Sequence, residues 1–295
     1  MKAWIKASRI PAQLFIFPAL LLGQGVALYN GYSFNLLHFI IIHLYGVFMH
    51  LFIVYGNDYA DFESDKVNHT FTPFTGGSRV LVEDLLSKSS LKKGFIVMGI
   101  MTMILGIIMS VLVESFIPFI LVLIGLIIFQ MYSFNPIKLS YRGYGESLQV
   151  LGVGIILPLV GYLMQGGNFD ALLLLTIIIL LPSQLAMALS TSMPDYPSDL
   201  KTKKHTTVVK IGPALSKYFI IGLYLLTGIG LMSLNLNGTS LLYPLIGIGL
   251  TLIIFFLAIH FKPLPGTQSL FFFVALSIFI NTYFVLSMGL QFMLS

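Results

Sequence analysis

The sequence contains no cysteine and very little charge, and both absences narrow the classes of protein to which it can belong. Without cysteine, the chain has no disulfides, no thiolate metal sites and no cysteine nucleophile. Charged residues make up 9% of its 295 residues, whereas an average soluble domain carries about 25%. The mean hydropathy of +0.94 excludes a soluble globule, a disordered chain and a nucleic-acid-binding arm. The composition therefore predicts a polytopic membrane protein that binds no nucleic acid.

Long charge-free runs predict an all-α fold in one domain, residues 1–295. A helix needs about 20 apolar residues to cross the hydrocarbon core. The runs 10–57 and 218–261 are long enough for two helices each, with turn signals at Asn30-Gly31 and Asn235–Gly238. Five shorter runs supply one helix each, and their continuous apolar character disfavours a barrel. The nine predicted transmembrane helices are 11–29, 36–58, 94–113, 116–134, 148–165, 171–193, 218–235, 241–260 and 268–292.

The basic residues predict how the chain is oriented in the membrane. All 16 lysines and arginines fall at the N-terminus or in the loops after the second, fourth, sixth and eighth predicted helices. The loops after the odd-numbered helices contain none. By the positive-inside rule, the N-terminus and the even-numbered loops are cytoplasmic and the C-terminus lies outside. The two longest cytoplasmic loops are 59–93 and 194–217.

Acidic residues concentrate in these two loops and suggest a metal site. Four of the 11 acids lie within 58–65, and two more follow the sixth helix. Like charges at such spacing repel, so the clusters require a counter-ion. Oxygen donors without histidine or cysteine suit Mg²⁺, which commonly bridges carboxylates to a substrate phosphate. The predicted metal ligands are Asn57, Asp58, Asp61, Asp65, Asp195 and Asp199.

The geometry expected of the two clusters differs. Continuation of the second helix places Asp58, Asp61 and Asp65 on one helical face. In the second cluster, Pro197 disfavours helix at the residue before it, which leaves the i, i+4 spacing of the two aspartates open. The alternative for both clusters, a solvated acidic helix end, is disfavoured because they share one membrane face in a chain poor in charge. The EF-hand spacing and its central glycine are absent.

Basic residues in the same loops suit a phosphate group. Arginine binds phosphate through two parallel hydrogen bonds and lysine acts as a point charge. Gly76, Gly77 and Ser78 could offer backbone N–H groups to an oxyanion. The alternative for the lysines is positive-inside charge in contact with lipid headgroups. The predicted diphosphate-binding residues are Arg79, Lys138, Arg142, Lys201 and Lys203.

The aspartate motifs resemble those of a known family. The pattern Asn57-Asp58-x-x-Asp61-x-x-x-Asp65 resembles the first aspartate-rich motif of the UbiA superfamily of intramembrane prenyltransferases, and Asp195-x-x-x-Asp199 resembles the second. Arg9, close to Pro11, resembles the N-terminal Arg-Pro element of that family. The stretches Gly76–Arg79 and Pro136–Leu139, with Gly143-x-Gly145-Glu146, look most like 1,4-dihydroxy-2-naphthoate polyprenyltransferases.

The resemblance implies Mg²⁺-dependent transfer of a polyprenyl group from a polyprenyl diphosphate to an aromatic acceptor such as 1,4-dihydroxy-2-naphthoate, with release of diphosphate. It also implies an integral protein of a bacterial or archaeal cell membrane, with the active site on the cytoplasmic side. The residues expected to carry catalysis are Asp61, Asp65, Asp195 and Asp199.

Two other functions remain open. A membrane terpene cyclase of the same superfamily would use the donor without an aromatic acceptor. An ion-coupled transporter is disfavoured, because transporters place ionisable groups near the bilayer midplane, whereas these aspartates lie at predicted helix ends. A CDP-alcohol phosphatidyltransferase is disfavoured because its DGxxAR pattern is absent.

Overall fold

The computed structural model describes residues 1–234 and 240–295, apart from the side chain of Leu14. Every regular element in these ranges is a helix, and the one β-type pairing is an isolated bridge between Thr72 and Thr75. The expected all-α class is therefore confirmed. The turn expected at Asn235–Gly238 lies outside the described residues.

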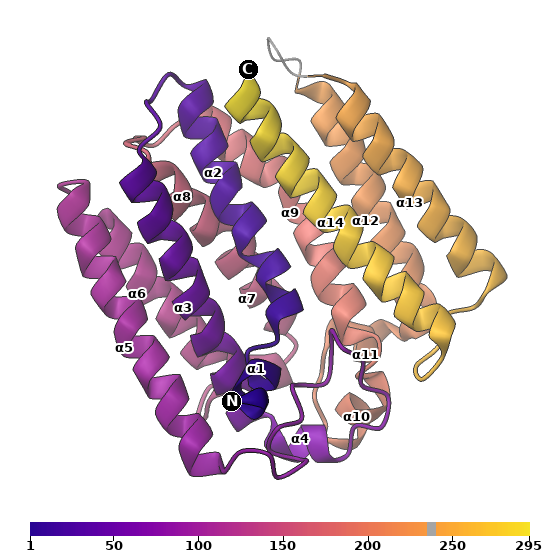
Figure 1. Cartoon of the computed structure of the whole chain (residues 1–295). Coiled ribbons are helices and arrows are strands. Elements are labelled where there is room, and N and C mark those ends of the chain that lie inside the picture. Colours follow the sequence, from indigo (N-terminus) through magenta and orange to yellow (C-terminus); the bar gives the residue numbers. More distant parts are fainter. Residues whose placement is uncertain (235–239) are drawn as a thin grey trace.

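The helices form a bundle with a layer of short helices at one end (Figure 1). The bundle contains α2 (Phe17–Tyr29), α3 (Leu36–Ala60), α5 (Lys88–Leu112), α6 (Ile117–Ser133), α7 (Gly145–Gln149), the π-helix η3 (Val150–Ile156), α8 (Leu157–Met164), α9 (Ala171–Ser192), α12 (Pro213–Ser233), α13 (Leu242–His260) and α14 (Gln268–Leu294). The short elements are α1 (Lys2–Ala7), η1 (Ile10–Phe15), α4 (Phe62–Lys66), η2 (Leu139–Tyr141), α10 (Tyr196–Lys201) and α11 (Thr207–Ile211).

Seven helices in the described residues are long and apolar enough to cross a membrane, with α7, η3 and α8 counted as one. An eighth is reached if the N-terminal pair Lys2–Gln13 and Phe17–Tyr29, bent by 41°, forms one span. The expected count of nine is therefore not supported. The first expected helix is broken by the 3₁₀ turn η1, and α6 stops after 17 residues, shortly before Pro136, which cannot continue a helix.

Helices α5 and α12 begin earlier than the charge pattern predicts. Helix α5 starts at Lys88 rather than at residue 94, because Ser87 caps it by accepting a hydrogen bond from the Ser90 N–H at 3.1 Å. Helix α12 starts at Pro213 rather than at residue 218, and proline is well suited to a first helical turn. Lysines lie inside both helices, and Lys217 of α12 is buried and donates to the carbonyl of Ala258 at 2.8 Å. A charge-free run therefore underestimates the length of the helix.

Helix α2 packs at close range against two neighbours, α8 and α14. A Cβ atom built at Gly23 would collide with the backbone carbonyl of Pro158 in α8. A Cβ atom at Gly25 would collide with the carbonyl of Gly289 in α14. Small residues let helix backbones approach closely in lipid, where dispersion contacts replace the hydrophobic effect as the driving force. These glycines therefore hold the two halves of the bundle together.

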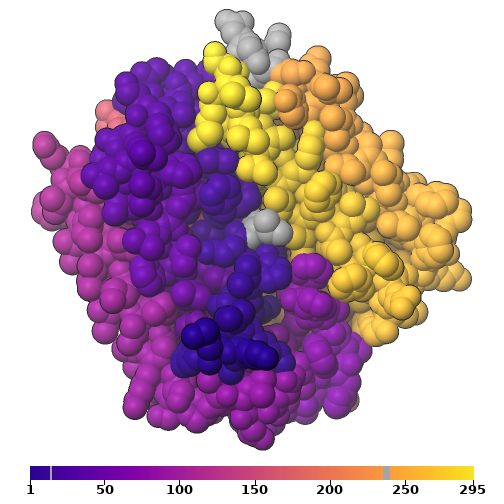
Figure 2. All heavy atoms as spheres, in the orientation of Figure 1, coloured from indigo at the N-terminus to yellow at the C-terminus, as the bar shows by residue number. Residues whose placement is uncertain are grey.

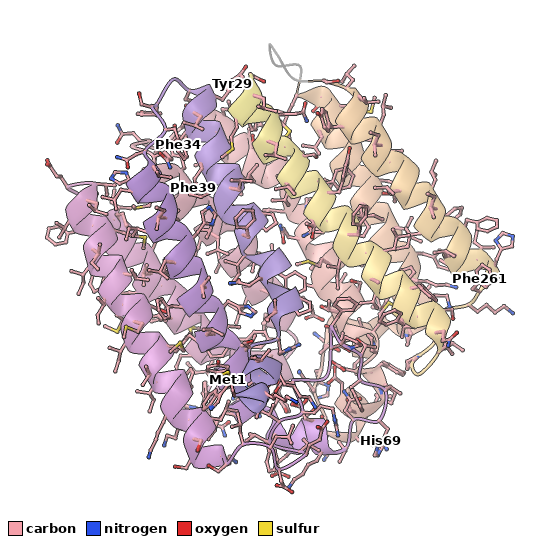
Figure 3. The ribbon with its side chains drawn as sticks, viewed as in Figure 1. Met1, Tyr29, Phe34, Phe39, His69 and Phe261 are labelled. Atoms are coloured by element: carbon pink, nitrogen blue, oxygen red, sulfur yellow. The ribbon has the colours of Figure 1, made fainter. Side chains whose placement is uncertain are left out.

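The two ends of the bundle differ in character. Met1 and His69 lie at the end that carries the short helices, whereas Tyr29 and Phe34 lie at the opposite end (Figure 3). Between the ends, the outward faces of α5 and α13 expose large apolar side chains, including Ile100, Ile107 and Leu252. An apolar belt of this kind suits a hydrocarbon environment, and the protein is an integral membrane protein.

Replacing Gly23 by valine should destabilise the folded protein strongly, because the added side chain would force α2 away from α8. The matched control is Gly222→Val in α12, where a Cβ atom meets nothing within 4 Å and the position is exposed. Thermal unfolding of both variants in detergent measures the effect. A Gly23→Val protein that melts like the control would contradict this account of the packing.

Candidate functional site

One cavity enters the bundle from the end with the short helices and joins polar and apolar surfaces. Its polar part is formed by the ends of α3 and α9, by α4 and α10, and by the loops around them. Its apolar part is formed by α3, α6 and the segment from η3 to α8, and includes Met49, Phe129 and Ile156. In Figure 2, the N-terminal residues lie at the lower centre of the face that is drawn. The cavity therefore suits a molecule with a charged head and an apolar tail.

The first aspartate motif lies where α3 passes into α4. The chain turns at Asp61, yet the N–H of Asp61 still bonds to the carbonyl of Asn57, and the N–H of Asp65 bonds to that of Asp61, both at 2.8 Å. The nearly helical path keeps the three aspartates of the motif on one side, as the spacing predicts. All three are buried, and Asp61 and Asp65 line the cavity.

Asp58 lies behind the cavity wall and has protein partners. Its carboxylate accepts hydrogen bonds from the N–H and the hydroxyl of Ser78, with the N–H at 3.1 Å. The guanidinium of Arg9 approaches to 3.9 Å. Asp58 is absent from the cavity lining. The backbone N–H of Ser78 therefore meets an oxyanion, as the sequence suggests, but that oxyanion is an aspartate of the protein.

The Gly76-Gly77 pair allows the loop to cross directly over the motif. Both residues have positive φ angles, 76° and 72°, which favour glycine. A Cβ atom at Gly77 would collide with the carboxylate of Asp65 and would lie 3.2 Å from Asp58. The loop backbone therefore forms a wall of the cavity that a larger residue at position 77 would fill.

The second motif lies at the start of α10. Asp195 is the residue before this helix, and Pro197 occupies its first turn, where no N–H is needed. The N–H of Asp199 bonds to the carbonyl of Asp195 at 2.8 Å. The i, i+4 arrangement is therefore kept despite the proline. The side chain of Asn68 donates to Asp195 at 2.8 Å, which ties the second motif to the first loop.

Lys204 joins the two motifs. Its Nζ lies 3.5 Å from a carboxylate oxygen of Asp61 and 4.0 Å from one of Asp199. Its position follows from a tight turn after α10, in which Lys203 has a positive φ of 55° and the Lys204 N–H bonds to the Asp199 carbonyl at 2.8 Å. Lys201 and Lys203 are exposed and do not line the cavity.

The other predicted basic residues also lie outside the cavity lining. Arg79 donates to the backbone carbonyl of Asp65 at 2.9 Å and stacks on the ring of Phe71. It therefore braces the first motif from behind. Lys138 lies over the ring of Tyr141 at 3.7 Å. Arg142 is exposed and donates to the carbonyl of Pro136 at 2.9 Å.

Several residues that the structure places at the site were missing from the predicted set. They are Arg9, Asn68, Glu146 and Lys204. Arg9 was noticed only through the family resemblance, and Lys204 is indistinguishable in the sequence from its two exposed neighbours. Glu146 lies in the Gly145-Glu146 pair, whose sequence gave no sign of burial. Only the folded chain brings these residues to the aspartates.

Burial is the main cause of the altered proton affinities at the site. It raises the pKa of Asp65 to about 8, with further increases from the charges of Asp61, Asp58 and Asp195. Burial likewise raises the pKa of Asp199 to about 7, although Lys204 opposes the rise. Burial lowers the pKa of Lys204, but the charges of Asp61 and Asp199 outweigh it and hold the pKa well above its usual value.

The donor set fits a hard divalent cation that shares its coordination with a ligand. The cavity lining contains five acidic side chains against two from lysine and arginine, so acidic groups outnumber basic ones. In addition, the buried Oδ1 of Asn57 has no hydrogen-bond partner. Among the described residues, no three acids or histidines converge on one point. The oxygen donors of the lining suit Mg²⁺, which usually takes one or two carboxylates and completes its shell with water and phosphate oxygens.

Comparisons with known proteins agree with this architecture. The sequence profile of the UbiA prenyltransferase family matches residues 15–287. A UbiA homolog from Archaeoglobus fulgidus bound to GPP and Mg²⁺ superposes with a TM-score of 0.67 at 18% identity, over 99% of this chain and 100% of that chain. A UbiA homolog from Aeropyrum pernix K1 gives 0.69 at 14% identity, over 95% and 98%. These likenesses show a shared fold, and no curated protein matches the sequence.

The raised pKa values predict that the metal-free protein becomes less stable as the pH rises. The folded state binds more protons than the unfolded chain between pH values near 3.8 and the raised values of about 7 and about 8, so unfolding becomes easier across this window. Thermal unfolding in a chelator should show the decline, and Mg²⁺ should raise the melting temperature more at the alkaline end. Asp65→Asn should flatten the dependence, whereas the exposed control Asp84→Asn should not.

Proposed function

Because the chain belongs to the UbiA prenyltransferase family, we propose that it transfers a polyprenyl group from a polyprenyl diphosphate to an aromatic acceptor and releases diphosphate. The observation that carries this proposal is the cavity in which both aspartate motifs face one space that continues into an apolar channel. A diphosphate head and an isoprenoid tail match these two surfaces. The structural relatives bound to GPP or DMAPP with Mg²⁺ support the same class of donor.

The polar part of the cavity would bind the diphosphate. Mg²⁺ would be held by the carboxylates of Asp61, Asp65, Asp195 and Asp199 and by the amide oxygen of Asn57, which has no hydrogen-bond partner. Asp58 would fix the loop at Ser78 through its hydrogen bond from the Ser78 N–H. When bound, Mg²⁺ supplies neutralisation of the negative charge that develops on the leaving diphosphate.

Basic side chains of the protein would also help to neutralise the charge on the diphosphate. Arg9 and Lys204 are the basic side chains closest to the aspartates, and each is largely buried. We assign them to the phosphate oxygens that the metal leaves free. Lys138, Arg142, Lys201 and Lys203 lie farther out and would attract the anionic donor electrostatically, while Arg79 keeps the first motif in place.

The apolar part of the cavity would hold the prenyl tail. Tyr45, Ile53, Ile128 and Val153 contribute to this lining, so the allylic carbon would lie between the carboxylates and an apolar region. Exclusion of water protects an allylic cation from hydrolysis. An electron-rich aromatic ring would then attack that carbon, as 1,4-dihydroxy-2-naphthoate can. The resemblance of Gly143-x-Gly145-Glu146 to the enzymes that use this acceptor supports the choice.

The charge distribution supports a cytoplasmic active site in a bacterial or archaeal cell membrane. The motifs share one end of the bundle with the N-terminus (Figure 1), and the lysines and arginines lie at the N-terminus or in loops assigned to this side. With α2 and α6 counted as spans, the chain would cross the membrane nine times and end outside.

Asp61→Asn should abolish Mg²⁺-dependent diphosphate release without unfolding the protein, because Asp61 lines the cavity and pairs with Lys204. The control is Glu63→Gln, two residues away, where the side chain is 78% exposed. Release from farnesyl and geranylgeranyl diphosphate would be measured with and without 1,4-dihydroxy-2-naphthoate. Release of diphosphate that needs metal but no acceptor would favour a terpene cyclase. Full activity of Asp61→Asn would contradict the role of Asp61 as a Mg²⁺ ligand.

Gly152→Phe should make the enzyme discriminate against long donors. Gly152 lies in the π-helix η3, lines the cavity, and has no atom within 4 Å of the position of a Cβ. A phenyl group there would occupy space assigned to the tail. The ratio of kcat/KM for geranylgeranyl and dimethylallyl diphosphate would be compared with that of Gly222→Phe, which faces outward. An unchanged ratio would place the tail elsewhere.

A further inference from the structure

Glu146 is a buried carboxylate in the cavity wall that the donor site does not use. It lies in the first turn of α7 and is 5% exposed. Its Oε1 accepts a hydrogen bond from the backbone N–H of Thr207 at 2.8 Å. Its Oε2 is buried and has no hydrogen-bond partner among the described residues. One oxygen of the carboxylate is therefore bonded to the protein, and the other is a buried acceptor without a partner in a residue that lines the cavity.

An ionised carboxylate can only accept hydrogen bonds, so the free oxygen requires a donor. Leaving a buried acceptor unpaired is unfavourable, and more so for a charged group. The described basic residues at the cavity, Arg9 and Lys204, are paired with aspartates. A ligand that carries a hydroxyl group would supply the missing donor.

Glu146 also lies beside the donor site. Thr207, which holds its Oε1, directly follows Thr206, whose hydroxyl donates to Asp199 at 3.5 Å. Tyr132, Gly145 and Gln149 line the cavity with Glu146 and come from α6 and α7, whereas the first aspartate motif comes from α3 and α4. A molecule held by Glu146 would therefore lie against a different wall from the first motif, and next to the second.

We propose that Oε2 of Glu146 accepts a hydrogen bond from the hydroxyl group of the acceptor, and so selects hydroxylated aromatic acceptors and orients them toward the donor. The inference rests on the proposed prenyl transfer and names the residue that would recognise the second substrate. A hydrogen bond from the hydroxyl to a carboxylate also increases the electron density of the ring, which favours attack on the allylic carbon. The proton stays on the acceptor oxygen in this recognition step.

The discriminating variant is Glu146→Gln. The glutamine oxygen can keep the bond from the Thr207 N–H, whereas its NH₂ group replaces the free acceptor with a donor. Glu146→Ala removes both oxygens and serves as the comparison. The probes are 1,4-dihydroxy-2-naphthoate and its two monomethyl ethers, each with geranylgeranyl diphosphate and Mg²⁺. Binding of the same probes without metal or donor, followed by thermal shift, gives a second readout.

We expect Glu146→Gln to melt like the wild type, to keep its KM for the donor, and to raise the KM for the dihydroxy acceptor about tenfold or more. The wild type should prefer the dihydroxy acceptor over the methyl ether that blocks the hydroxyl bound by Glu146. In Glu146→Gln, the ratio of kcat/KM between these two acceptors and the ratio of their binding affinities should both move closer to one.

If Glu146→Gln matches the wild type and only Glu146→Ala is impaired, the residue is structural and the proposal fails. If the glutamine variant instead loses Mg²⁺ affinity with unchanged acceptor binding, Glu146 is a metal ligand and the proposal also fails. Absence of prenyl transfer in the wild type would overturn the proposed function itself.

Discussion

The main physical constraint on this structure is the repulsion among carboxylates that lie close together at one end of an apolar bundle. Asp58, Asp65, Asp195 and Asp199 lie close to Asp61, where burial raises their own pKa values and makes their ionised forms costly. The protein offsets this cost only in part, with Arg9 at one side and Lys204 between the motifs. Acidic side chains still outnumber basic ones in the cavity lining, so the site suits a divalent cation.

The surrounding fold is arranged to bring these charges together and to keep them in place. Helix α3 ends among them, and the loop after it returns over the carboxylates through two glycines with positive φ. The side chain of Asn68 then reaches the start of α10. The basic partners Arg9 and Lys204 come from different parts of the chain. Displacement of either one would leave a buried carboxylate without its partner, which is strongly unfavourable.

The bundle supports the site through close packing of backbones. Glycines in α2 bring it against α8 on one side and α14 on the other, and α8 continues the π-helix that lines the apolar part of the cavity. A π-helix widens the helical turn and often marks a functional site. In this protein it presents Gly152 to the cavity. The same packing thus gives the bundle its rigidity and the cavity its shape.

Local pattern in the sequence was enough to predict an all-helical membrane protein and to indicate two acidic clusters near helix ends. Apolar runs gave the membrane helices because lipid requires every backbone polar group to bond within a helix. The acid spacing gave both aspartate motifs, and the single-sided basic loops suggested a common face. Helix ends were less accurate, since Ser87 and Pro213 start helices that a count of charge-free residues cannot detect.

Which charges meet was decided only by the tertiary structure. Lys204 differs from Lys201 and Lys203 solely by the turn that carries it inward, and Arg79 faces backbone carbonyls although its sequence neighbours suggested a phosphate. The burial of Glu146 depends on α7 lying beside the first residue of α11, Thr207. Pairing between residues distant in sequence is set by how helices and loops approach one another in three dimensions, and no local periodicity encodes that approach.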